Sequence, residues 1–440
     1  MEMSDKTETP MTTKPSYTPA LRFPDFLNDG EWEDYSIEEV FDIRNGYTPS
    51  KSKAEYWENG TIPWFRMEDI RANGNILSDS IQHITPEAIK GFGLLPAYSI
   101  IVATSATIGE HALITVESLA NQRFTYLSKK KSFEERVDMM YFHYYMFVID
   151  EWCKKNTNTG GFLSVNMSAF RQLRIPLPPL PEQRRIAQAL TALDELIAAT
   201  NEKLEQMKAY KKGLMQQLFV DSMGGKLLKI NYLQISKLRF PEFYEEKEWE
   251  EKKLGEVAMK ITNKNKNNQT FLVLTNSATE GVISQQNYFD REIVSKENLS
   301  NYYIIEIDDF VYNPRISVAA PVGPISRNRI DKGVMSPLYT IFRFKEGDID
   351  FYEQFFRTNC WHQYLKDKAN FGARFDRMNI SNEDFMNMPI PTPSLSEQRK
   401  IASCLSTMDE TINAYTEKVG LLGQFKKGLM QGMFPQNQMN

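Results

Sequence analysis

IPLPPLPEQRRIAQALTALDEL, residues 175–196, returns later in the chain as IPTPSLSEQRKIASCLSTMDET, residues 390–411. Both copies continue to nearly the same ending, KKGLMQQLF at 211–219 and KKGLMQGMF at 426–434. About 23 of the 45 positions from each start match without a gap, which is far above chance. The chain therefore contains an internal duplication, with a period too long for a solenoid.

The beginning of each copy is duplicated as well. LRFPDF at 21–26 is followed by Trp32, and LRFPEF at 238–243 is followed by Trp249 at the same spacing. The stretches between these matching ends share only scattered features, which predicts two similar frames holding two different domains. The predicted boundaries are a floppy tail over 1–20, a first domain over 21–175, a first repeated helix over 176–220, a linker over 221–237, a second domain over 238–390, a second repeated helix over 391–434 and a tail over 435–440.

The repeated segment has the pattern of a long helix that needs a partner. Its apolar residues step by four and three, a seam with a period of 3.5 residues that is typical of coiled coils. About 37 helical residues would form a rod of about 55 Å. Thr200, Lys211 and Lys426 interrupt the seam. The predicted pairing residues are Ile186, Leu190, Leu193, Ile197, Leu204, Ile401, Leu405, Met408, Ile412 and Val419.

The start of each helix is also signalled. Pro181 with Glu182 suits a first helical turn, and Ser394 with Glu397 resembles a capping box. Since one such helix cannot bury its own apolar stripe, the nearest partner is the other copy. We expect an antiparallel pair with an approximate two-fold axis; the alternative is a bundle helix within one domain.

The segments between the frames predict mixed α/β domains. Period-two and β-branched runs indicate strands, and longer apolar periodic runs indicate helices. Strands are expected over 61–65, 98–104, 271–274, 303–307 and 338–344, and helices over 138–155 and 351–365. The fold class is therefore α/β (α+β), with two domains of mixed α/β fold joined by the paired helices.

Composition excludes several classes of protein. The 440 residues carry a net charge of −5, and 41% are hydrophobic, enough for sizeable cores. There is no long apolar run for a membrane span, and the first 20 residues lack the apolar segment of a signal peptide. Three cysteines and four histidines without ligand spacing argue against disulfides and zinc clusters, so we expect a cytoplasmic protein. DNA binding would need local basic patches or charge from a partner.

Loops in both domains carry side chains suited to DNA. Arginine pairs with guanine and asparagine or glutamine with adenine, whereas lysine and hydroxyl groups suit phosphates. Any one of these residues could equally be a solvated surface group, so only the set is informative. The DNA-binding candidates are Thr48, Ser50, Lys51, Arg66, Thr104, Ser105, Thr107, Gln122, Arg123, Lys264, Lys266, Asn313, Arg315, Arg327, Arg329, Arg374 and Arg377.

Motifs for catalysis are not found. The sequence has no phosphate-binding GxxxxGK[ST] loop. Glu245-Glu246-Lys247 resembles a nuclease carboxylate–lysine pair, but such a match is expected by accident in so charged a stretch. We therefore expect a non-catalytic chain without metal or cofactor. An enzyme acting alone, nuclease or methyltransferase, and a coiled-coil scaffold that never touches DNA remain as alternatives.

The repeated motif closely resembles that of the DNA-specificity subunit of type I restriction–modification systems. In this family a P-x-L-x-EQRR/K-IA run precedes a leucine-rich helix and KKGLMQ. The opening LRFP with its tryptophan, Gly46–Ser50 and Thr61–Trp64 are similar to the family as well. The matching residues are Pro178, Leu180, Glu182, Gln183, Arg184, Ile186, Ala187 and Lys211–Leu214, and Pro393, Leu395, Glu397, Gln398, Arg399, Ile401, Ala402 and Lys426–Leu429.

The resemblance implies two target-recognition domains, each binding half of a bipartite double-stranded DNA site. It also implies helices that pair antiparallel, separate the domains and dock two modification subunits. Those subunits bind S-adenosylmethionine and methylate adenine, and further restriction subunits use ATP and magnesium to translocate and cleave DNA. This chain would then carry no catalytic residue and no cofactor, and would have no contact with membranes.

Overall fold

The computed structural model describes residues 17–91, 93–158, 163–219, 238–266, 270–285, 296–369 and 376–435. They form two compact units, of which unit 1 contains the described residues up to Thr200 and those from Lys418 onward, and unit 2 contains Asn201–Glu417. Each unit thus combines one predicted domain with part of both repeated helices. The predicted linker 221–237 and most of both predicted tails lie outside the described residues. No helix among the described residues is long and apolar enough to cross a membrane.

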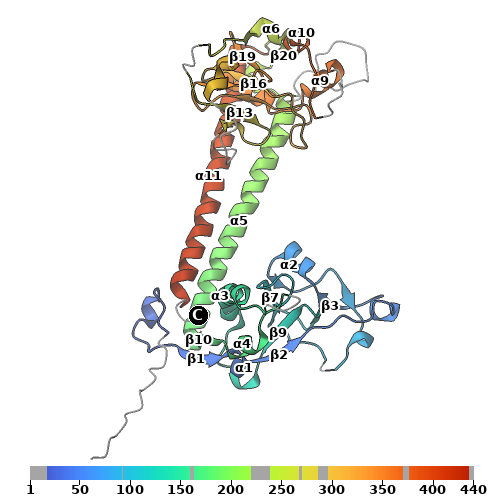
Figure 1. Cartoon of the computed structure of the whole chain (residues 1–440), viewed down its shortest axis with the longest axis vertical. Helices are drawn as coiled ribbons and strands as arrows, with labels where there is room; N and C mark the ends of the chain where they lie inside the picture. Colours follow the sequence, from blue (N-terminus) through green and yellow to red (C-terminus); the bar gives the residue numbers. More distant parts are fainter. Residues whose placement is uncertain are drawn as a thin grey trace, which may run out of the picture. The chain divides into compact units, whose positions relative to one another are not determined.

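Unit 1 is built on a sheet in the order β2-β9-β6-β7-β4, with β1 paired to β10 and a smaller sheet β5-β3-β8. Helix α3 packs against β7 (Figure 1). The strands are β1 (Glu33–Ser36), β2 (Phe41–Asn45), β3 (Ile62–Phe65), β4 (Ile76–Leu77), β5 (His83–Ile84), β6 (Ser99–Ala103), β7 (His111–Ile114), β8 (Leu119–Ala120), β9 (Phe124–Lys129) and β10 (Arg174–Leu177). The helices are α1 (Ile37–Val40), α2 (Met67–Asn73), α3 (Met139–Lys155), α4 (Met167–Gln172) and the start of α5 (Leu180–Leu218).

Unit 2 repeats this plan with a sheet in the order β12-β19-β16-β17, while β11 pairs with β20, β13 with β14 and β15 with β18. The strands are β11 (Glu250–Lys253), β12 (Ala258–Ile261), β13 (Leu274–Ser277), β14 (Gly281–Ser284), β15 (Tyr303–Ile305), β16 (Phe310–Tyr312), β17 (Ile325–Arg327), β18 (Gly333–Met335), β19 (Thr340–Phe344) and β20 (Pro389–Thr392). The helices are α6 (Leu254–Val257), α8 (Ile349–Phe356), α9 (His362–Lys368), α10 (Asn382–Met386) and the start of α11 (Leu395–Met433).

A buried ion pair fastens the start of each long helix to the LRFP segment. Arg22 binds both carboxylate oxygens of Glu182 at 2.7 Å, and Arg239 binds those of Glu397 at 2.8 and 2.7 Å. Both glutamate side chains are only 1% exposed. Ser394 accepts from the backbone N–H of Glu397, as the predicted capping box requires, but the Glu397 side chain binds Arg239 instead of closing the box. LRFP and EQR thus recur together because the arginine of one motif binds the glutamate of the other in each unit.

The glutamine of EQR connects the long helix to the domain's main helix. Gln183 accepts from the backbone N–H of Asp138 at 2.9 Å, and Gln398 accepts from that of Asp348 at 2.7 Å. Asp138 and Asp348 are the N-caps of α3 and α8. Both glutamines are buried, so their amides also satisfy backbone carbonyls that water cannot reach.

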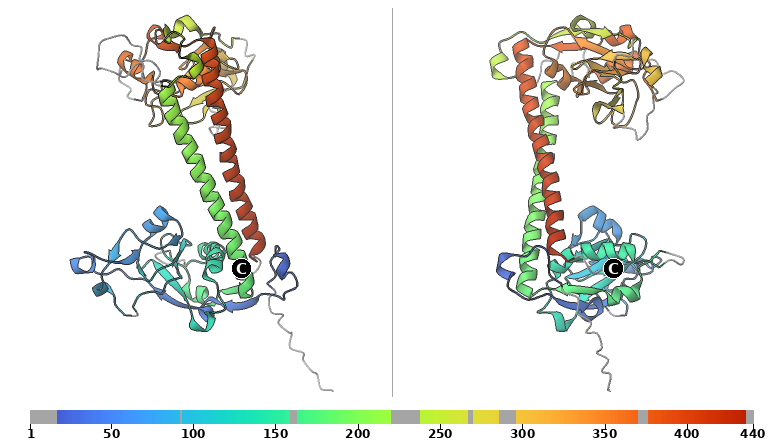
Figure 2. Two further views of the ribbon diagram at one scale, coloured as in Figure 1. Left: turned by 180° about the vertical axis from the view of Figure 1, so that it is seen from behind. Right: turned by 60° about the vertical axis from the view of Figure 1, so that its left-hand side comes forward.

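The two long helices pair within each unit, and the antiparallel pairing predicted from the seam is confirmed. In unit 1 the Nζ of Lys426 lies 2.5 Å from Asp194, and in unit 2 the Nζ of Lys211 lies 2.5 Å from Asp409. Lys426 is the counterpart of Lys211 in the repeat, and Asp409 is the counterpart of Asp194. Each lysine therefore reaches the aspartate of the other copy. Figure 2 shows the first turns of α5 beside the last turns of α11 in unit 1.

The seam residues divide between pairing and the domain cores. Leu190 and Leu405 have no exposed surface and pack into the core of units 1 and 2, respectively. Lys211 and Thr200, the polar residues that interrupt the apolar seam, are buried too, at 7% and 5% exposure. Buried seam residues are Ile186, Leu190, Leu193, Leu204, Ile401 and Leu405, and half-buried ones are Ile197, Met408, Ile412 and Val419.

The end of each helix packs on the domain of the other copy. Phe434 lies against Tyr141 and Tyr145 in unit 1, with ring centroids 5.7 and 5.6 Å apart. Its counterpart Phe219 lies against Phe351 and Phe355 in unit 2, at 5.3 and 6.0 Å. The repeated ending KKGLMQ-x-x-F is therefore an anchor for the opposite domain.

Three predictions of local structure need correction. The strand expected over 271–274 lies further along the chain, as β13 (Leu274–Ser277). The single helix expected over 351–365 is divided into α8 and α9, because the Thr358 hydroxyl donates to the Phe355 carbonyl and accepts from the Cys360 N–H, which replaces helical hydrogen bonds. Tyr17, in the stretch expected to be a tail, is buried beside Trp32, and burial with the nearby Asp34 raises its pKa to about 12. The folded part thus begins before residue 21.

Candidate nucleic-acid interface

Most of the predicted DNA-binding residues of unit 1 gather at one end of its main sheet, which we call loop end 1. Here β2 and β6 finish and β9 begins, because Asn45 pairs with Thr125 and Ala103 pairs with Phe124. The loops at this end contain three groups of candidates. They are Thr48, Ser50 and Lys51 after β2, Thr104, Ser105 and Thr107 after β6, and Gln122 and Arg123 before β9.

Hydrogen bonds join these three loops. The hydroxyl of Thr48 donates to the side-chain oxygen of Gln122. The Thr104 N–H donates to the carbonyl of Arg123 at 3.2 Å, and its hydroxyl lies 3.0 Å from that of Thr125. Gly46 permits the close approach, since a Cβ there would lie 2.2 Å from the carbonyl oxygen of Asn121. Ser50, Lys51, Gln122 and Arg123 are left exposed.

Arg66 reaches the same end from the smaller sheet. It follows β3, whose Phe65 carbonyl accepts from the Asn121 N–H at 3.0 Å. Its backbone N–H donates to Asp69 at 2.6 Å, which fixes the start of α2. The guanidinium lies over the ring of Trp64, 5.8 Å from its centroid. Its side chain is 26% exposed, so part of it can still meet a ligand.

Unit 2 presents an equivalent end, loop end 2, where β12 and β16 finish and β19 begins. Ile261 and Val311 both pair with Ile341, which places the two strand ends side by side. Lys264 and Lys266 follow β12, and Asn313 and Arg315 follow β16. Arg377 joins them through an antiparallel bridge to Arg315. Asn313 holds its loop, because its amide donates to the Asn276 carbonyl and accepts from the Arg315 N–H.

Arg327 and Arg329 do not join this cluster. Arg327 pairs with Phe310, the first residue of β16, and therefore lies at the opposite end of the sheet. Its side chain is 8% exposed and forms ion pairs with Asp308, Asp350 and Glu353. Arg329 pairs with Asp350 and Glu353 as well. These carboxylates neutralise the charges of both arginines. The local sequence around Arg327 and Arg329 does not reveal these partners. Arg374 lies outside the described residues.

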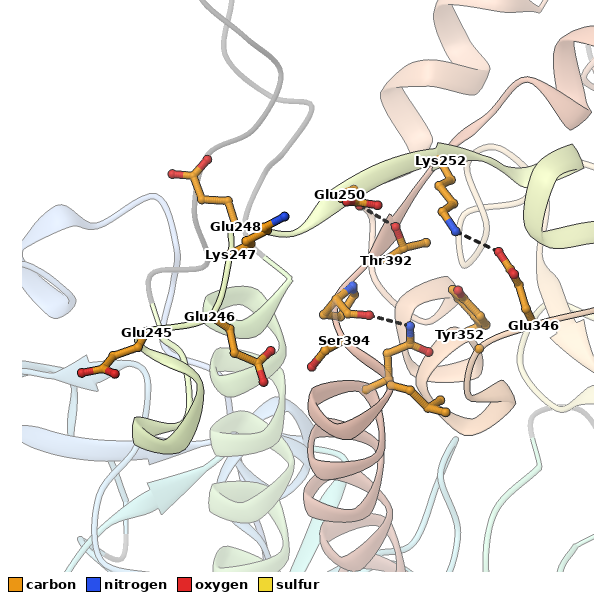
Figure 3. A pocket seen from close by; sticks show the side chains of 14 residues that line it. Glu245, Glu246, Lys247, Glu248, Glu250, Lys252, Glu346, Tyr352, Thr392 and Ser394 are labelled. Carbon is orange, nitrogen blue, oxygen red and sulfur yellow. Dashed lines mark hydrogen bonds and ion pairs between the residues drawn. The ribbon is translucent and has the colours of Figure 1, made fainter.

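An acidic pocket of about 690 Å³ lies in unit 2 and contains the stretch considered as a nuclease motif (Figure 3). Glu245, Glu246 and Glu248 line it together with Lys247, and their carboxylates point in different directions. Lys252 pairs with Glu346 at 2.9 Å across the pocket. Among the described residues, no three His, Cys, Asp or Glu side chains are placed to hold a metal ion. The pocket offers neither converging ligands nor the charge to attract phosphate.

The polar cluster of His111, His143 and Asp150 is a structural one. His111 lies 2.6 Å from Asp150 and 3.2 Å from His143, all three side chains being buried. Burial, with the charge of Lys426, lowers the pKa of His143, so this ring is held neutral. Burial raises the pKa of Asp150, although His111 opposes the shift. Since solvent does not reach them, these groups hold β7 to α3.

Comparison with known proteins gives a consistent family. The family model for the type I restriction modification DNA specificity domain matches residues 29–209 and 246–420. The type I restriction enzyme EcoprrI specificity subunit of Escherichia coli is 50% identical over 187 residues, 41% of this chain and 47% of the relative. A putative MjaX specificity subunit of Methanocaldococcus jannaschii is 28% identical over 279 residues, 61% of this chain and 60% of the relative. The chain thus matches about half the length of these relatives.

Solved structures agree on the fold. The crystal structure of a type I restriction–modification S subunit from M. genitalium has a TM-score of 0.54 at 15% identity, with 95% of this chain and 99% of that chain covered. A chain from a study of type I complex assembly and conformational transition has a TM-score of 0.54 at 14% identity, covering 92% and 98%. At such identities the likeness concerns the fold alone.

Proposed function

The chain belongs to the family of type I restriction–modification specificity subunits, and from this premise we propose that loop ends 1 and 2 each bind one half of an asymmetric bipartite DNA target. The observation that carries the proposal is that equivalent ends of two equivalent sheets gather polar loops, and that the side chains there differ. A duplicated scaffold with unlike contact residues suits two unlike half-sites.

The contact residues of the proposal are those that the fold brings to the two loop ends. Gln122 and Arg123 at loop end 1, and Arg315 at loop end 2, have the donor geometry for base edges. Arg377, opposite Arg315, can contact either base edges or phosphates. Lysines and hydroxyl groups would contact phosphates and fix the register. The phosphate candidates are Thr48, Ser50, Lys51, Thr104, Ser105, Thr107, Lys264 and Lys266, with Arg66 beside them.

We propose that the long helices also dock two modification subunits. Tyr210 and its counterpart Phe425 are exposed aromatic residues, at 68% and 58%. One turn further, Gly213 and its counterpart Gly428 would accept a Cβ that meets no described atom within 4 Å. A helix-interior glycine costs about 1 kcal/mol relative to alanine. Two glycines at matching positions, unneeded by the chain's own packing, are what a closely approaching partner helix would use.

The chemistry would belong to the partners. Modification subunits would bring S-adenosylmethionine and methylate adenine, and restriction subunits would bring ATP and magnesium. Because this chain carries a net charge of −5, the modification subunits would also share the neutralisation of phosphates. The spacing between the half-sites, about 10 base pairs on one face of the duplex, would be set by the length of the helices.

The direct test is binding by the assembled complex. The full chain with its modification subunits should shift a subset of genomic DNA fragments and methylate adenine in them in the presence of S-adenosylmethionine. A complex that assembles but binds all fragments alike would contradict the proposal and favour a scaffold that does not read DNA. Tight specific binding by the chain alone would contradict the sharing of charge.

An enzyme acting alone is the competing function. The purified chain, incubated with DNA, magnesium and S-adenosylmethionine, should form neither cleaved nor methylated product. Product that appears without partner subunits, and that copurifies with the chain through several columns, would replace this proposal.

A further inference from the structure

Two arginines lie directly opposite each other at loop end 2. Arg315 and Arg377 are partners in an isolated antiparallel bridge. The Ile316 N–H donates to the Asp376 carbonyl at 2.9 Å, and the Met378 N–H donates to the Pro314 carbonyl at 2.8 Å. These bonds flank the arginine pair instead of joining its members. In such a pair the two side chains leave the same face at the shortest cross-strand separation.

This arrangement leaves positive charge without a full counterion. Like charges directly opposite each other on a sheet destabilise it. The Nε of Arg377 lies 3.9 Å from the half-exposed Asp376, at the limit of an ion pair, and the exposed Arg315 forms no ion pair with a described residue. Arg327, at the far end of the same sheet, has three carboxylate partners. The pair at loop end 2 therefore has a place for an external acceptor.

The loop that carries Arg315 also carries a fully exposed valine. Val318 is 102% exposed at the tip of a turn in which Ser317 and Ala320 exchange backbone hydrogen bonds of 3.0 and 3.2 Å. Behind the tip, Ala320 and Val322 are buried. Gly323 adopts φ +82°, and a Cβ there would lie 2.0 Å from the Asn313 carbonyl oxygen. The turn is thus anchored on buried residues while its apolar tip faces solvent.

We propose that this loop reads a thymine beside a guanine in the half-site of unit 2. Arg315 donates two hydrogen bonds to guanine O6 and N7, and Val318 packs on the C5 methyl of the thymine. Arg377, held next to Asp376, contacts the phosphate backbone. Valine has a stiff side chain, so little rotamer freedom is lost on contact. The inference rests on the proposed function, since it names bases in the target of that site.

The equivalent loop of unit 1 has different side chains from the Arg315 loop of unit 2. The equivalent loop between β6 and β7 carries Thr104, Ser105 and Thr107 in place of Arg315 and Val318. Their hydroxyl groups can contact several bases and phosphates. Thr104 and Thr107 each carry one methyl group as well, but both are partly buried, whereas Val318 is fully exposed. Dependence on a thymine methyl through Val318 should therefore be confined to one half-site.

The test uses base analogues in the mapped target of the complete chain with its modification subunits. Uracil in place of thymine removes only the methyl group, and 7-deazaguanine removes only the N7 acceptor. One uracil position in the half-site of unit 2 should weaken binding about fourfold, the effect of one buried methyl. In Val318→Ala this factor should fall to about one. In Arg315→Met the penalty for 7-deazaguanine should vanish, since methionine has no hydrogen-bond donor to offer to N7.

The controls separate this inference from the proposed function. Ile307→Ala removes an exposed β-branched residue (53%) that precedes β16 at the other end of the sheet, and it should retain both analogue penalties. Arg377→Ala should weaken binding to all sequences and reduce the salt slope by about one. Specific binding that is indifferent to every uracil, or equally sensitive in Val318→Ala, would overturn the inference but leave the proposed function intact. Absence of any specific binding would overturn the proposed function itself.

Discussion

Units 1 and 2 use the same contacts at the start of their long helices and different ones at their loop ends. Arg22–Glu182 and Arg239–Glu397 are counterparts, as are the bonds of Gln183 and Gln398 to the N-caps of α3 and α8. Loop end 1 combines hydroxyl groups and Gln122 with Lys51 and Arg123, whereas loop end 2 has lysines and an arginine pair. The contacts at the helix starts are thus common to both units, whereas the side chains that the proposed function assigns to DNA binding differ between them.

The largest effect should come from breaking a shared buried ion pair. Arg239→Ala would leave Glu397 charged and 1% exposed, which should cost about 3–5 kcal/mol of unfolding free energy. Arg22→Ala should cost a similar amount through Glu182. Hydrogen exchange of peptides from each unit would show which one is loosened. Lys400→Ala, which breaks the exposed pair with Glu242, should cost less than about 1 kcal/mol.

If Arg239→Ala increased hydrogen exchange in unit 1 as much as in unit 2, the stability of the two units would not be independent. The double replacement Arg239→Met with Glu397→Leu should recover most of the loss, because no buried charge would remain.

The buried seam positions come next. Leu190→Ala and Leu405→Ala should each cost about 2–5 kcal/mol, since both leucines have no exposed surface. The matched variants Leu196→Ala and Leu421→Ala, at 46% and 57% exposure on the same helices, should change stability little. Denaturant unfolding measures all four. Equal losses at buried and exposed positions would contradict the described seam.

The reciprocal lysine–aspartate pairs should differ in strength. The side chains of Lys211 and Asp409 are 9% and 29% exposed, and those of Lys426 and Asp194 are 20% and 40% exposed. Lys211→Met should cost about 1–3 kcal/mol, because a partly buried carboxylate loses one of its two cations and keeps only Arg357. Lys426→Met should cost less than about 1 kcal/mol. The reverse order in a denaturant titration would show that burial does not set the difference.

The smallest effect is a dependence on acid. Burial by itself raises the pKa of Asp409, but hydrogen bonds from Lys211 and Gln354 and the charges of Lys211 and Arg357 outweigh it, so its pKa is lowered. A carboxylate with a lowered folded pKa stabilises the fold above its unfolded pKa, near 3.9, and this contribution is lost as pH falls through the folded value. Stability measured between pH 6 and pH 2 should fall less steeply in Lys211→Met than in the wild type. If stability fell equally steeply with pH in both proteins, the Lys211–Asp409 pair would not be a cause of the acid dependence.

The matching ends of the two copies could be predicted from the sequence, because the duplication presents the same motifs twice. The seam, the antiparallel pairing and the capping by Ser394 follow from periodicity and local chemistry. The roles of Arg22 and Gln183 do not, since their partners lie far away in the chain and only their recurrence marked them.

The loop ends were predictable in part. Composition marked Thr48, Gln122 and Arg315 as candidates, because few side-chain types suit DNA, and the fold brings them to the loop ends. It could not separate Arg315 from Arg327, since only the fold reveals that carboxylates of other segments surround Arg327. Val318 carried no signal in the sequence, because only the structure shows that this apolar residue is fully exposed.

The most direct test that each domain recognises its own half-site is the exchange of one domain. Residues 27–174 would be replaced by the matching segment of another specificity subunit, and methylated adenines would be mapped across the genome of a host that carries the modification subunits. One half-site should change while the other half-site and the spacer stay the same. A change in both half-sites, or in the spacer, would contradict separate recognition by the two domains.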